Sequence, residues 1–152
     1  SLNDTEKYDA IILSGSYDFL PTEEDFSKEI KLIKEYSKPI LGICFGFQLI
    51  CYAYGSKLEK LYAEEKGILH IDITIPDKIF DGLNSLKVFE NHRWYIKEIK
   101  TLIPLAKSKD GIEAIKHPEK KIYGFQFHPE SFIKKTDGKR LIRNFLELCQ
   151  DK

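Results

Sequence analysis

The first third of the chain alternates between short apolar runs and segments in which apolar residues recur at helical spacing. The runs at residues 8–15 and 38–43 predict buried strands. Between them, apolar side chains recur from Phe26 to Tyr36 and predict a helix, with Thr22 as its expected N-cap. Strands joined by helical crossovers indicate a parallel sheet.

The remaining two thirds predict mostly strands. Residues 48–55 predict a helix that ends at Gly55. The strand patterns that follow lie at 67–75, 86–91, 112–116 and 121–127. A terminal amphipathic helix is expected over 141–149, with Leu141, Phe145 and Leu148 on one face. The short connections between the later strands predict an antiparallel extension of the same sheet, and the fold class is therefore α/β.

Size and charge narrow the function classes. The 152 residues suit one domain, which we expect to span 1–152, and 42% of them are hydrophobic. Lys plus Arg equals Asp plus Glu, at 24 each, which argues against a nucleic-acid binder. No apolar run reaches membrane-spanning length, so we expect no membrane partner. Three cysteines do not indicate a disulfide framework, and a cytoplasmic location is the simplest expectation.

A Gly-x-Cys-x-Gly step joins the strand at 38–43 to the next helix. Cys44 stands between Gly42 and Gly46, which is the pattern of a nucleophile elbow. Such a turn strains the backbone of the nucleophile and admits only small neighbours. It also places the sulfur at a helix N-terminus, where the thiolate is favoured. The amide of Phe45 would then point toward the oxygen of a tetrahedral intermediate.

The alternative interpretation is that Cys44 is a buried small hydrophobic residue, as free cysteines often are. Cys51 and Cys149 provide the contrast, because both lie in helical patterns among apolar neighbours without flanking glycines. We assign these two to the core and retain Cys44 as the candidate nucleophile.

A thiol nucleophile needs a base that later returns a proton to the leaving group, and histidine suits this task because its pKa lies near neutrality. His128 follows the apolar strand pattern at 121–127, and strand ends are where α/β folds gather active-site groups. Pro129 fixes the backbone, and Glu130 is placed to accept a hydrogen bond from the imidazole. Cys44, His128 and Glu130 are the predicted triad.

The tripeptide His-Pro-Glu occurs a second time, at residues 117–119. That copy lies in a charged segment between two strand patterns, so we predict a hairpin loop without catalytic function. His70 lies within an alternating strand and is expected to be structural. His92 remains open between a structural and a functional role.

With Cys44 in its elbow and Phe-His-Pro-Glu at 127–130, the chain resembles the class I glutamine amidotransferase family. The segments that carry the resemblance are 12–16, 39–48, 79–83, 88–92, 112–117 and 122–131. The resemblance implies a flavodoxin-like fold and glutamine as substrate. It implies hydrolysis of glutamine to glutamate and ammonia through a thioester on Cys44, without a metal or organic cofactor.

The resemblance also implies roles for further residues. The amides of Gly15 and Phe45 correspond to the family's oxyanion hole. Gln48 matches a glutamine-binding position, while Asn91 and His92 lie in a stretch that contacts the amino-acid end of the substrate. The loop after Gly15 departs from the family pattern, since Ser16 and Tyr17 stand where a second Gly and a Pro are usual.

Such enzymes pass ammonia to a synthase subunit or domain, and the resemblance therefore implies a synthase partner. The similarity is greatest to the amidotransferase component of GMP synthetase, through residues 112–117, 122–130 and the terminal helix. Two departures are Arg93-Trp94-Tyr95 after His92, and Ser-Phe-Ile after Glu130, where that component usually has an acidic residue and a His-Thr pair respectively.

Family members usually begin with a strand and helix before the first strand seen here, so we expect that unit to be missing and the domain to be N-terminally incomplete. The chain contains no Met and starts at Ser1, which fits this expectation. Two rival functions remain. One is a γ-glutamyl peptide hydrolase with the same triad, and the other is a catalytically silent family member.

Overall fold

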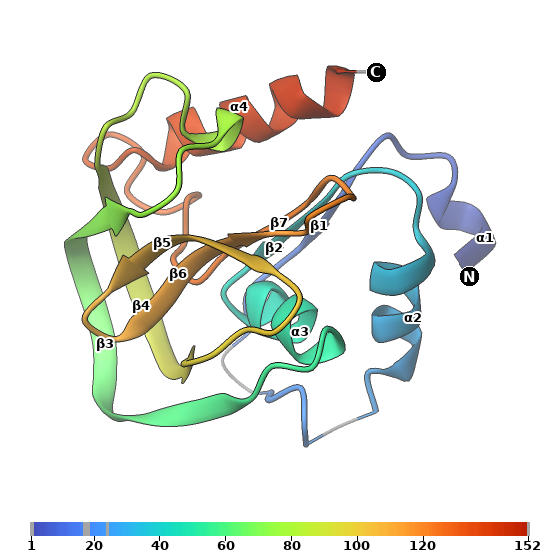
Figure 1. Cartoon of the computed structure of the whole chain (residues 1–152), viewed down its shortest axis with the longest axis horizontal. Coiled ribbons are helices and arrows are strands. Elements are labelled where there is room, and N and C mark those ends of the chain that lie inside the picture. Colours follow the sequence, from blue (N-terminus) through green and yellow to red (C-terminus); the bar gives the residue numbers. More distant parts are fainter. Residues whose placement is uncertain (1, 17–18, 24, 152) are drawn as a thin grey trace.

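Figure 1 shows a computed structural model of the chain, in which residues 2–16, 19–23 and 25–151 are described. Seven strands form one sheet in the order β1-β2-β7-β6-β5-β3-β4. In chain order the elements are α1 (Leu2–Thr5), β1 (Ile11–Leu13), α2 (Ser27–Glu35), β2 (Ile40–Ile43), α3 (Phe45–Ala53), β3 (Leu58–Ile73), η1 (Lys78–Phe80), β4 (Leu86–Ile96), β5 (Ile103–Ser108), β6 (Gly111–Lys116), β7 (Ile122–Phe125) and α4 (Gly138–Gln150).

The sheet is parallel at one end and antiparallel at the other. β1, β2 and β7 run parallel, with Gly42 of β2 opposite Gly124 of β7. β6, β5, β3 and β4 then continue the sheet with antiparallel pairings. This confirms the predicted α/β class and the antiparallel extension. The carboxyl ends of the parallel strands β2 and β7 meet at one edge of the sheet, and the chain beyond these ends carries Cys44 and His128.

Apolar side chains pack against both faces of the sheet, as their alternation along the strands predicts. On β2, Leu41 and Ile43 join the core beneath α4, whereas Ile40 joins the core formed with α2 and α3. Leu141 and Phe145 of α4 are buried in the first of these cores, which confirms the predicted apolar face of the terminal helix. Helices therefore cover both faces of the sheet (Figure 1).

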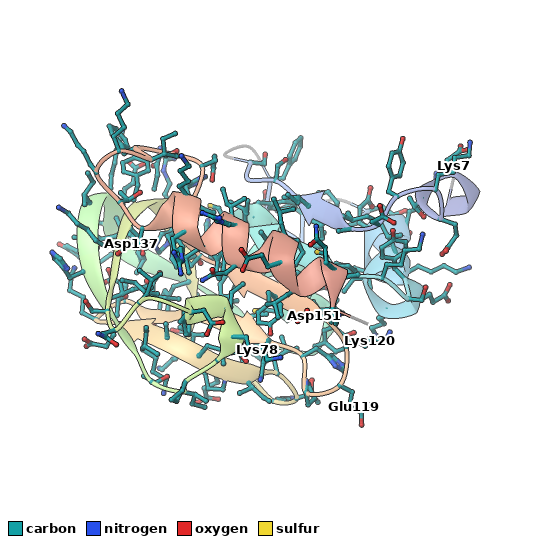
Figure 2. The ribbon with its side chains drawn as sticks, turned by 90° about the horizontal axis from the view of Figure 1, so that it is seen from above. Lys7, Lys78, Glu119, Lys120, Asp137 and Asp151 are labelled. Carbon is teal, nitrogen blue, oxygen red and sulfur yellow. The ribbon has the colours of Figure 1, made fainter. Side chains whose placement is uncertain are left out.

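α4 crosses one face of the sheet, as the view from above in Figure 2 shows. Lys78 of η1 lies near Asp151, which follows the end of α4, and their charged atoms are 4.0 Å apart (Figure 2). Asn144 of α4 also donates hydrogen bonds to the backbone carbonyls of Ile79 and Asp81, at 2.8 and 3.0 Å. These contacts fix α4 against η1 and its flanking loop.

The boundaries of the helices differ from the sequence expectation. α2 begins at Ser27, so the expectation that Thr22 caps this helix is wrong. The carboxylate of Asp25 accepts a hydrogen bond from the Ser27 amide at 3.0 Å and forms a local turn before the helix. α3 begins at Phe45 and α4 at Gly138, three residues earlier than the respective sequence patterns predict.

Two strand features escaped the sequence analysis. β3 starts at Leu58, nine residues before the predicted strand. The sequence analysis missed its first half because that half is charged, mostly exposed and without the expected alternation. β5 was not predicted, and Pro104 explains this, since proline is unusual within a central strand. The pairing of β5 with β6 is accordingly irregular next to Pro104.

β1 forms the edge of the sheet on the parallel side, and the side chain of Ile12 is 49% exposed there. In the described part of the chain, no helix has the length and apolar character needed to cross a membrane.

Candidate active site

The nucleophile elbow predicted from the sequence is present between β2 and α3. Cys44 has φ 51° and ψ −102°, a backbone conformation that non-glycine residues rarely adopt. A Cβ atom at Gly42 would lie 2.6 Å from the backbone of Gly46, and one at Gly46 would collide with the backbone carbonyl of Leu13. Both flanking glycines are therefore required by close backbone packing, as expected for this turn.

His128 and Glu130 follow β7 and interact directly. Nδ1 of His128 is 2.7 Å from Oε1 of Glu130, so the ring presents its Nδ1–H to the carboxylate. The backbone amide of His128 donates to the carbonyl oxygen of Phe89 on β4, at 2.8 Å, and this bond anchors the segment. The imidazole is buried while Glu130 is partly exposed. His128 and Glu130 thus stand in the arrangement that the predicted triad requires of its base and orienting carboxylate.

Gly15, just beyond β1, packs against both Cys44 and His128. A Cβ atom at Gly15 would lie 2.9 Å from Cε1 of His128 and 3.4 Å from Cβ of Cys44. The loop therefore packs against both side chains at once. Any residue other than glycine at position 15 would displace the imidazole. The sulfur and the imidazole lie on the same side of the sheet.

The electrostatics of His128 reflect both of its partners. Burial by itself lowers the pKa of the imidazole, but its interactions with Cys44 and Glu130 outweigh burial and raise the pKa to about 10. Glu130 responds in the opposite direction: burial raises its pKa, and the hydrogen bond with His128 overcomes this and lowers it. Nε2 of His128 has no hydrogen-bond partner among the described residues.

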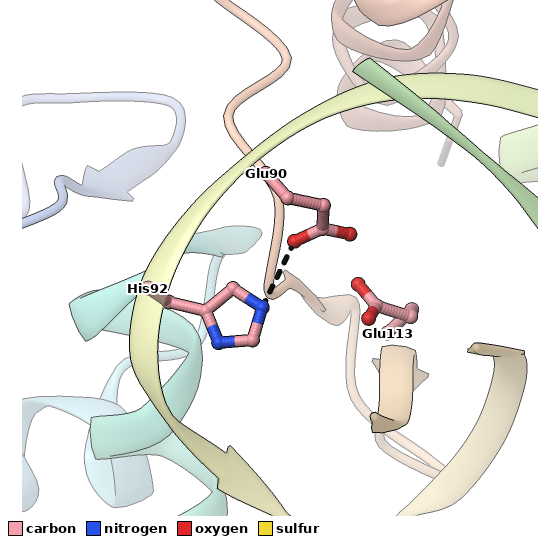
Figure 3. A group of neighbouring side chains, drawn as sticks. All are labelled: Glu90, His92 and Glu113. Carbon is pink, nitrogen blue, oxygen red and sulfur yellow. Dashed lines mark ion pairs between the residues drawn. The ribbon is translucent and has the colours of Figure 1, made fainter. Parts of the chain in front are cut away.

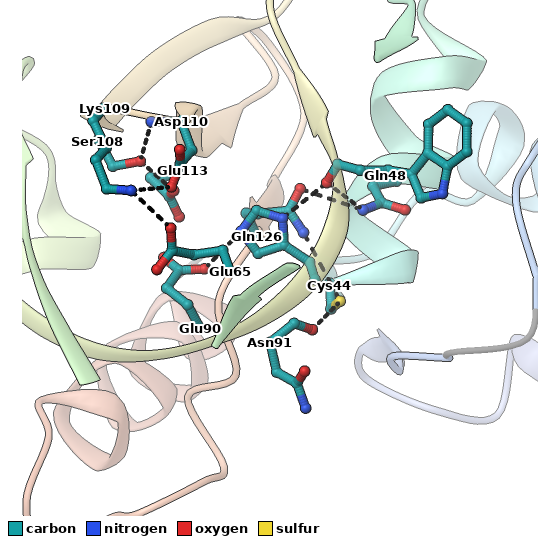
Figure 4. Close-up of polar contacts among 12 residues, drawn as sticks. Cys44, Gln48, Glu65, Glu90, Asn91, Ser108, Lys109, Asp110, Glu113 and Gln126 are labelled. Carbon is teal, nitrogen blue, oxygen red and sulfur yellow. Dashed lines mark hydrogen bonds and ion pairs between the residues drawn. The ribbon is translucent and has the colours of Figure 1, made fainter. Parts of the chain in front are cut away.

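Two further groups touch the sulfur, and Figure 4 shows them around Cys44. The backbone carbonyl oxygen of Asn91 is 3.7 Å from Sγ, and Nε2 of Gln126 is 3.8 Å from it. The sequence analysis missed Gln126. Its neighbours Phe125 and Phe127 stack in the core at 4.9 Å between ring centroids, so the alternation of the strand already indicated that Gln126 points to the other face.

A cavity of about 250 Å³ opens beside the sulfur. Gln48 of α3 is buried in its wall and donates from Nε2 to the carbonyl oxygen of Trp94 at 3.1 Å. The wall also carries charges of both signs, on Glu23, Lys60 and Arg93. Such a cavity suits a small polar ligand with both an ammonium and a carboxylate group.

Two of the remaining predicted site residues line the same cavity, and Phe45 is not among the residues that line it. Phe45 is the first residue of α3, where backbone N–H groups lack intrahelical partners. Asn91 and His92 line the cavity wall on β4. Ser16 lines it as well, while Tyr17, the other departure from the family loop, lies outside the described residues.

Comparison with known proteins agrees with this geometry. Residues 1–149 match the model of the family described as glutamine amidotransferase class-I. The chain belongs to the class-I glutamine amidotransferase family. It is 40% identical over 149 residues to a subunit of the glutamine-hydrolyzing GMP synthase of Pyrococcus abyssi, and the match covers 91% of this chain and 74% of that protein. The same subunit from Thermococcus kodakarensis is also 40% identical, over 146 residues, and the match covers 91% of this chain and 74% of that protein.

A solved structure of similar sequence has the same fold as this chain. The crystal structure of a proposed GMP synthase subunit from Thermoplasma acidophilum superposes with a TM-score of 0.87 at 30% identity. The match covers 97% of this chain and 76% of that one. The flavodoxin-like fold implied by the sequence resemblance is thereby confirmed.

The other cysteines of this amidotransferase differ from Cys44 as expected. Cys51 on α3 is fully buried among apolar side chains, and this burial raises the pKa of its thiol. Cys149 is only partly buried, so its assignment to the core holds in part, and burial is again the main cause of its raised pKa. Neither thiol is favoured as a thiolate nucleophile.

Proposed function

We propose that this class-I glutamine amidotransferase hydrolyses glutamine with Cys44 as nucleophile, His128 as general acid and base, and Glu130 as the group that orients the imidazole. The observation that carries the proposal is the packing of Gly15 against both Cys44 and His128 beside a polar cavity. The strained backbone of Cys44 supports it, because such strain concentrates at functional sites.

In the first half of the reaction, the Cys44 sulfur forms a bond to the side-chain amide carbon of glutamine. The amides of Phe45 and Gly15 would stabilise the resulting oxyanion, and a single donor of this kind is worth about 3–4 kcal/mol in other enzymes. The carbon–nitrogen bond then breaks, and the protonated His128 gives its proton to the departing ammonia. A thioester on Cys44 remains.

In the second half, His128 takes a proton from water, and the water oxygen attacks the thioester carbon. The carbon–sulfur bond breaks, glutamate leaves, and Cys44 is again paired with a protonated His128. The carboxylate of Glu130 accepts the Nδ1–H at 2.7 Å throughout and stabilises the imidazolium each time it forms.

The cavity supports glutamine as the molecule bound. Its volume of about 250 Å³ is below the roughly 300–1,000 Å³ typical of pockets for drug-sized ligands. We propose that Gln48 and the backbone of Asn91 hold the substrate, and that the charged side chains of Glu23, Lys60 and Arg93 face its ammonium and carboxylate groups.

The names of the relatives point to the fate of the ammonia. The Pyrococcus and Thermococcus proteins are both named as one subunit of a glutamine-hydrolyzing GMP synthase. We therefore propose that this chain delivers ammonia to a synthase subunit of the same type. We also propose a reducing cytoplasm as its location, which the free state of Cys44, Cys51 and Cys149 supports.

Release of glutamate from glutamine, measured with and without a candidate synthase subunit, tests the proposal. Cys44→Ala should abolish release, because no thioester can form. Cys51→Ala is the matched control on the same helix and should retain most of the activity of the unsubstituted chain. Equal losses in both variants would contradict the assignment of the nucleophile, and a lack of release from the unsubstituted chain with every candidate synthase would favour a silent family member.

A further inference from the structure

A second group of buried ionisable side chains lies next to the active site but outside the triad. Glu90 and His92 on β4 and Glu113 on β6 point toward one another (Figure 3). Their exposed fractions are 0%, 4% and 2%. One potential ligand atom from each lies within 4.8 Å of the other two. The glutamine chemistry proposed above assigns no role to either glutamate.

The hydrogen bonding of His92 shows that the cluster of Glu90, His92 and Glu113 requires a positive species. Nδ1 of His92 is 2.9 Å from the carbonyl oxygen of Trp94, which can only accept, so Nδ1 carries the hydrogen. In the neutral ring, Nε2 then presents a lone pair, and it faces Oε2 of Glu90 at 3.1 Å. Two lone pairs at this distance repel unless a positive species lies between them, either a proton or a metal ion.

No lysine or arginine supplies that charge within the described part of the chain. Lys109 is the nearby cation, and it pairs with Glu65 at 3.1 Å and Asp110 at 3.4 Å rather than with the buried group (Figure 4). Both oxygens of Glu90 and Oε2 of Glu113 lack hydrogen-bond partners among the described residues. A buried carboxylate without a partner is costly, so this group needs a positive species beside it.

We propose that Glu90, His92 and Glu113 bind one divalent transition-metal cation of the zinc type. Two carboxylates and one imidazole are oxygen and nitrogen donors of the kind zinc binds, with bonds of about 2.0–2.2 Å. Two such ligands in tetrahedral geometry lie about 3.3 Å apart, close to the 3.1 Å between His92 and Glu90. The ligand atom of Glu113 lies within 4.8 Å of the other two, so it would need to move toward the ion while Ser108 holds its other oxygen.

The surroundings of the three ligands support a metal centre. The bond from Nδ1 of His92 to a backbone carbonyl is the outer contact that metal-bound histidines commonly make, and it leaves Nε2 for the ion. Oε1 of Glu113 accepts a hydrogen bond from Ser108 at 2.6 Å, which leaves its other oxygen for the ion. The ligands are thus oriented by groups that do not compete for the metal.

The site would stabilise the wall of the substrate cavity rather than take part in the chemistry. His92 lines that cavity, and the Trp94 carbonyl oxygen that accepts from His92 also accepts from Gln48 at 3.1 Å. An ion on Nε2 would hold the His92 ring, and with it the carbonyl that positions Gln48.

Metal titration of the chelator-treated Cys44→Ala variant tests the proposal without the competing thiolate and without glutamine, so its outcome is independent of the proposed function. Zn²⁺ should bind with a stoichiometry of one per chain and raise the melting temperature by on the order of 5 °C at saturation. Co²⁺ should give the visible absorption of a site with nitrogen and oxygen ligands.

The conservative changes Glu113→Gln and Glu90→Gln, each in the Cys44→Ala background, should weaken Zn²⁺ binding at least tenfold and remove the cobalt absorption. A surface control, His117→Gln with Glu119→Gln, should bind as the parent does, and circular dichroism establishes that each variant is folded. Should the parent bind no ion, or bind it no better than the Glu113→Gln variant, shared protons hold the group and the metal proposal fails.

Discussion

The tripeptide His-Pro-Glu occurs twice in this chain, and the two copies have opposite hydrogen bonding. In the copy at 128–130, Nδ1 of His128 faces the carboxylate of Glu130 at 2.7 Å and carries a hydrogen. In the copy at 117–119, Nδ1 of His117 accepts hydrogen bonds from the backbone amides of Glu119 and Lys120, at 3.1 and 3.0 Å. Nδ1 thus donates in one copy and accepts in the other, where the imidazole stabilises a turn.

The pKa values differ in the same sense. Burial lowers the pKa of His128, but its interactions with Cys44 and Glu130 outweigh burial and raise the pKa to about 10. Burial and the charge of Lys120 instead lower the pKa of His117. The tripeptide by itself therefore carries no catalytic information. The surroundings distinguish the two copies. His128 follows the end of β7 and lies beside Cys44, whereas His117 lies in the β6–β7 hairpin.

Replacement of His128 and of His117 by alanine, in separate variants, tests this comparison and should give the largest difference in the rate of glutamate release. His128→Ala removes the proton carrier for both half-reactions, and glutamate release should fall by about 10³-fold or more. His117→Ala should change the same rate less than twofold, because His117 touches no cavity residue. A similar loss of activity in both variants would contradict the distinction.

Gly15→Ala should produce the next largest effect. The added Cβ would lie 2.9 Å from Cε1 of His128, so the ring must move to accept it. Small misplacements of catalytic groups commonly cost up to about 10²-fold in rate, and we expect a loss of 10- to 100-fold in kcat for glutamate release with an unchanged melting temperature. An unaffected kcat would show that the ring position is not critical.

Glu130→Gln should lower kcat by about tenfold, since the amide still fills the space but no longer stabilises the imidazolium. It should also move the alkaline limb of the pH–rate profile to lower pH, because the pKa of His128 depends in part on the Glu130 carboxylate. Glu119→Gln, the matched change in the second tripeptide, should leave rate and profile as they are. A limb that stays in place would assign the raised pKa to Cys44 alone.

The same pairing predicts how folding stability depends on pH. The folded-state pKa of His128 is raised above its ordinary value of about 6.5, to about 10. The resulting stabilisation is fully present below pH ~6.5, provided that Glu130 is ionised, and is lost as the pH rises through about 10. Denaturant unfolding of the unsubstituted chain and of Glu130→Gln should show a smaller difference at pH 10 than at pH 7.

The smallest effect is expected for the stability of the hairpin. His117→Ala removes an acceptor for two backbone amides, and the free energy of unfolding should fall by about 1 kcal/mol. Urea denaturation measures this change, with Glu119→Gln as a control that keeps the acceptor. An unchanged midpoint for His117→Ala would show that water replaces the imidazole without cost.

The sequence by itself determined the elements whose signal is local. Gly42, Cys44 and Gly46 predicted the elbow because only small residues fit that turn, and the apolar run before His128 placed this histidine at a strand end. The sequence also predicted that the first His-Pro-Glu tripeptide lies in a hairpin loop, because its neighbours are charged, and the structure confirms this hairpin. These patterns rely on residues within a few positions of one another.

The tertiary structure decided everything that depends on contacts between distant segments. Gly15 reaches His128, Gln126 reaches Cys44, and Glu90 faces Glu113 only after strands that are distant in the sequence have been assembled into the sheet. Local patterns carry no information about such pairings, because strand order and register are set by packing across the whole sheet. The candidate nucleophile and base could thus be predicted from the sequence, whereas the residues that surround them were placed only by the fold.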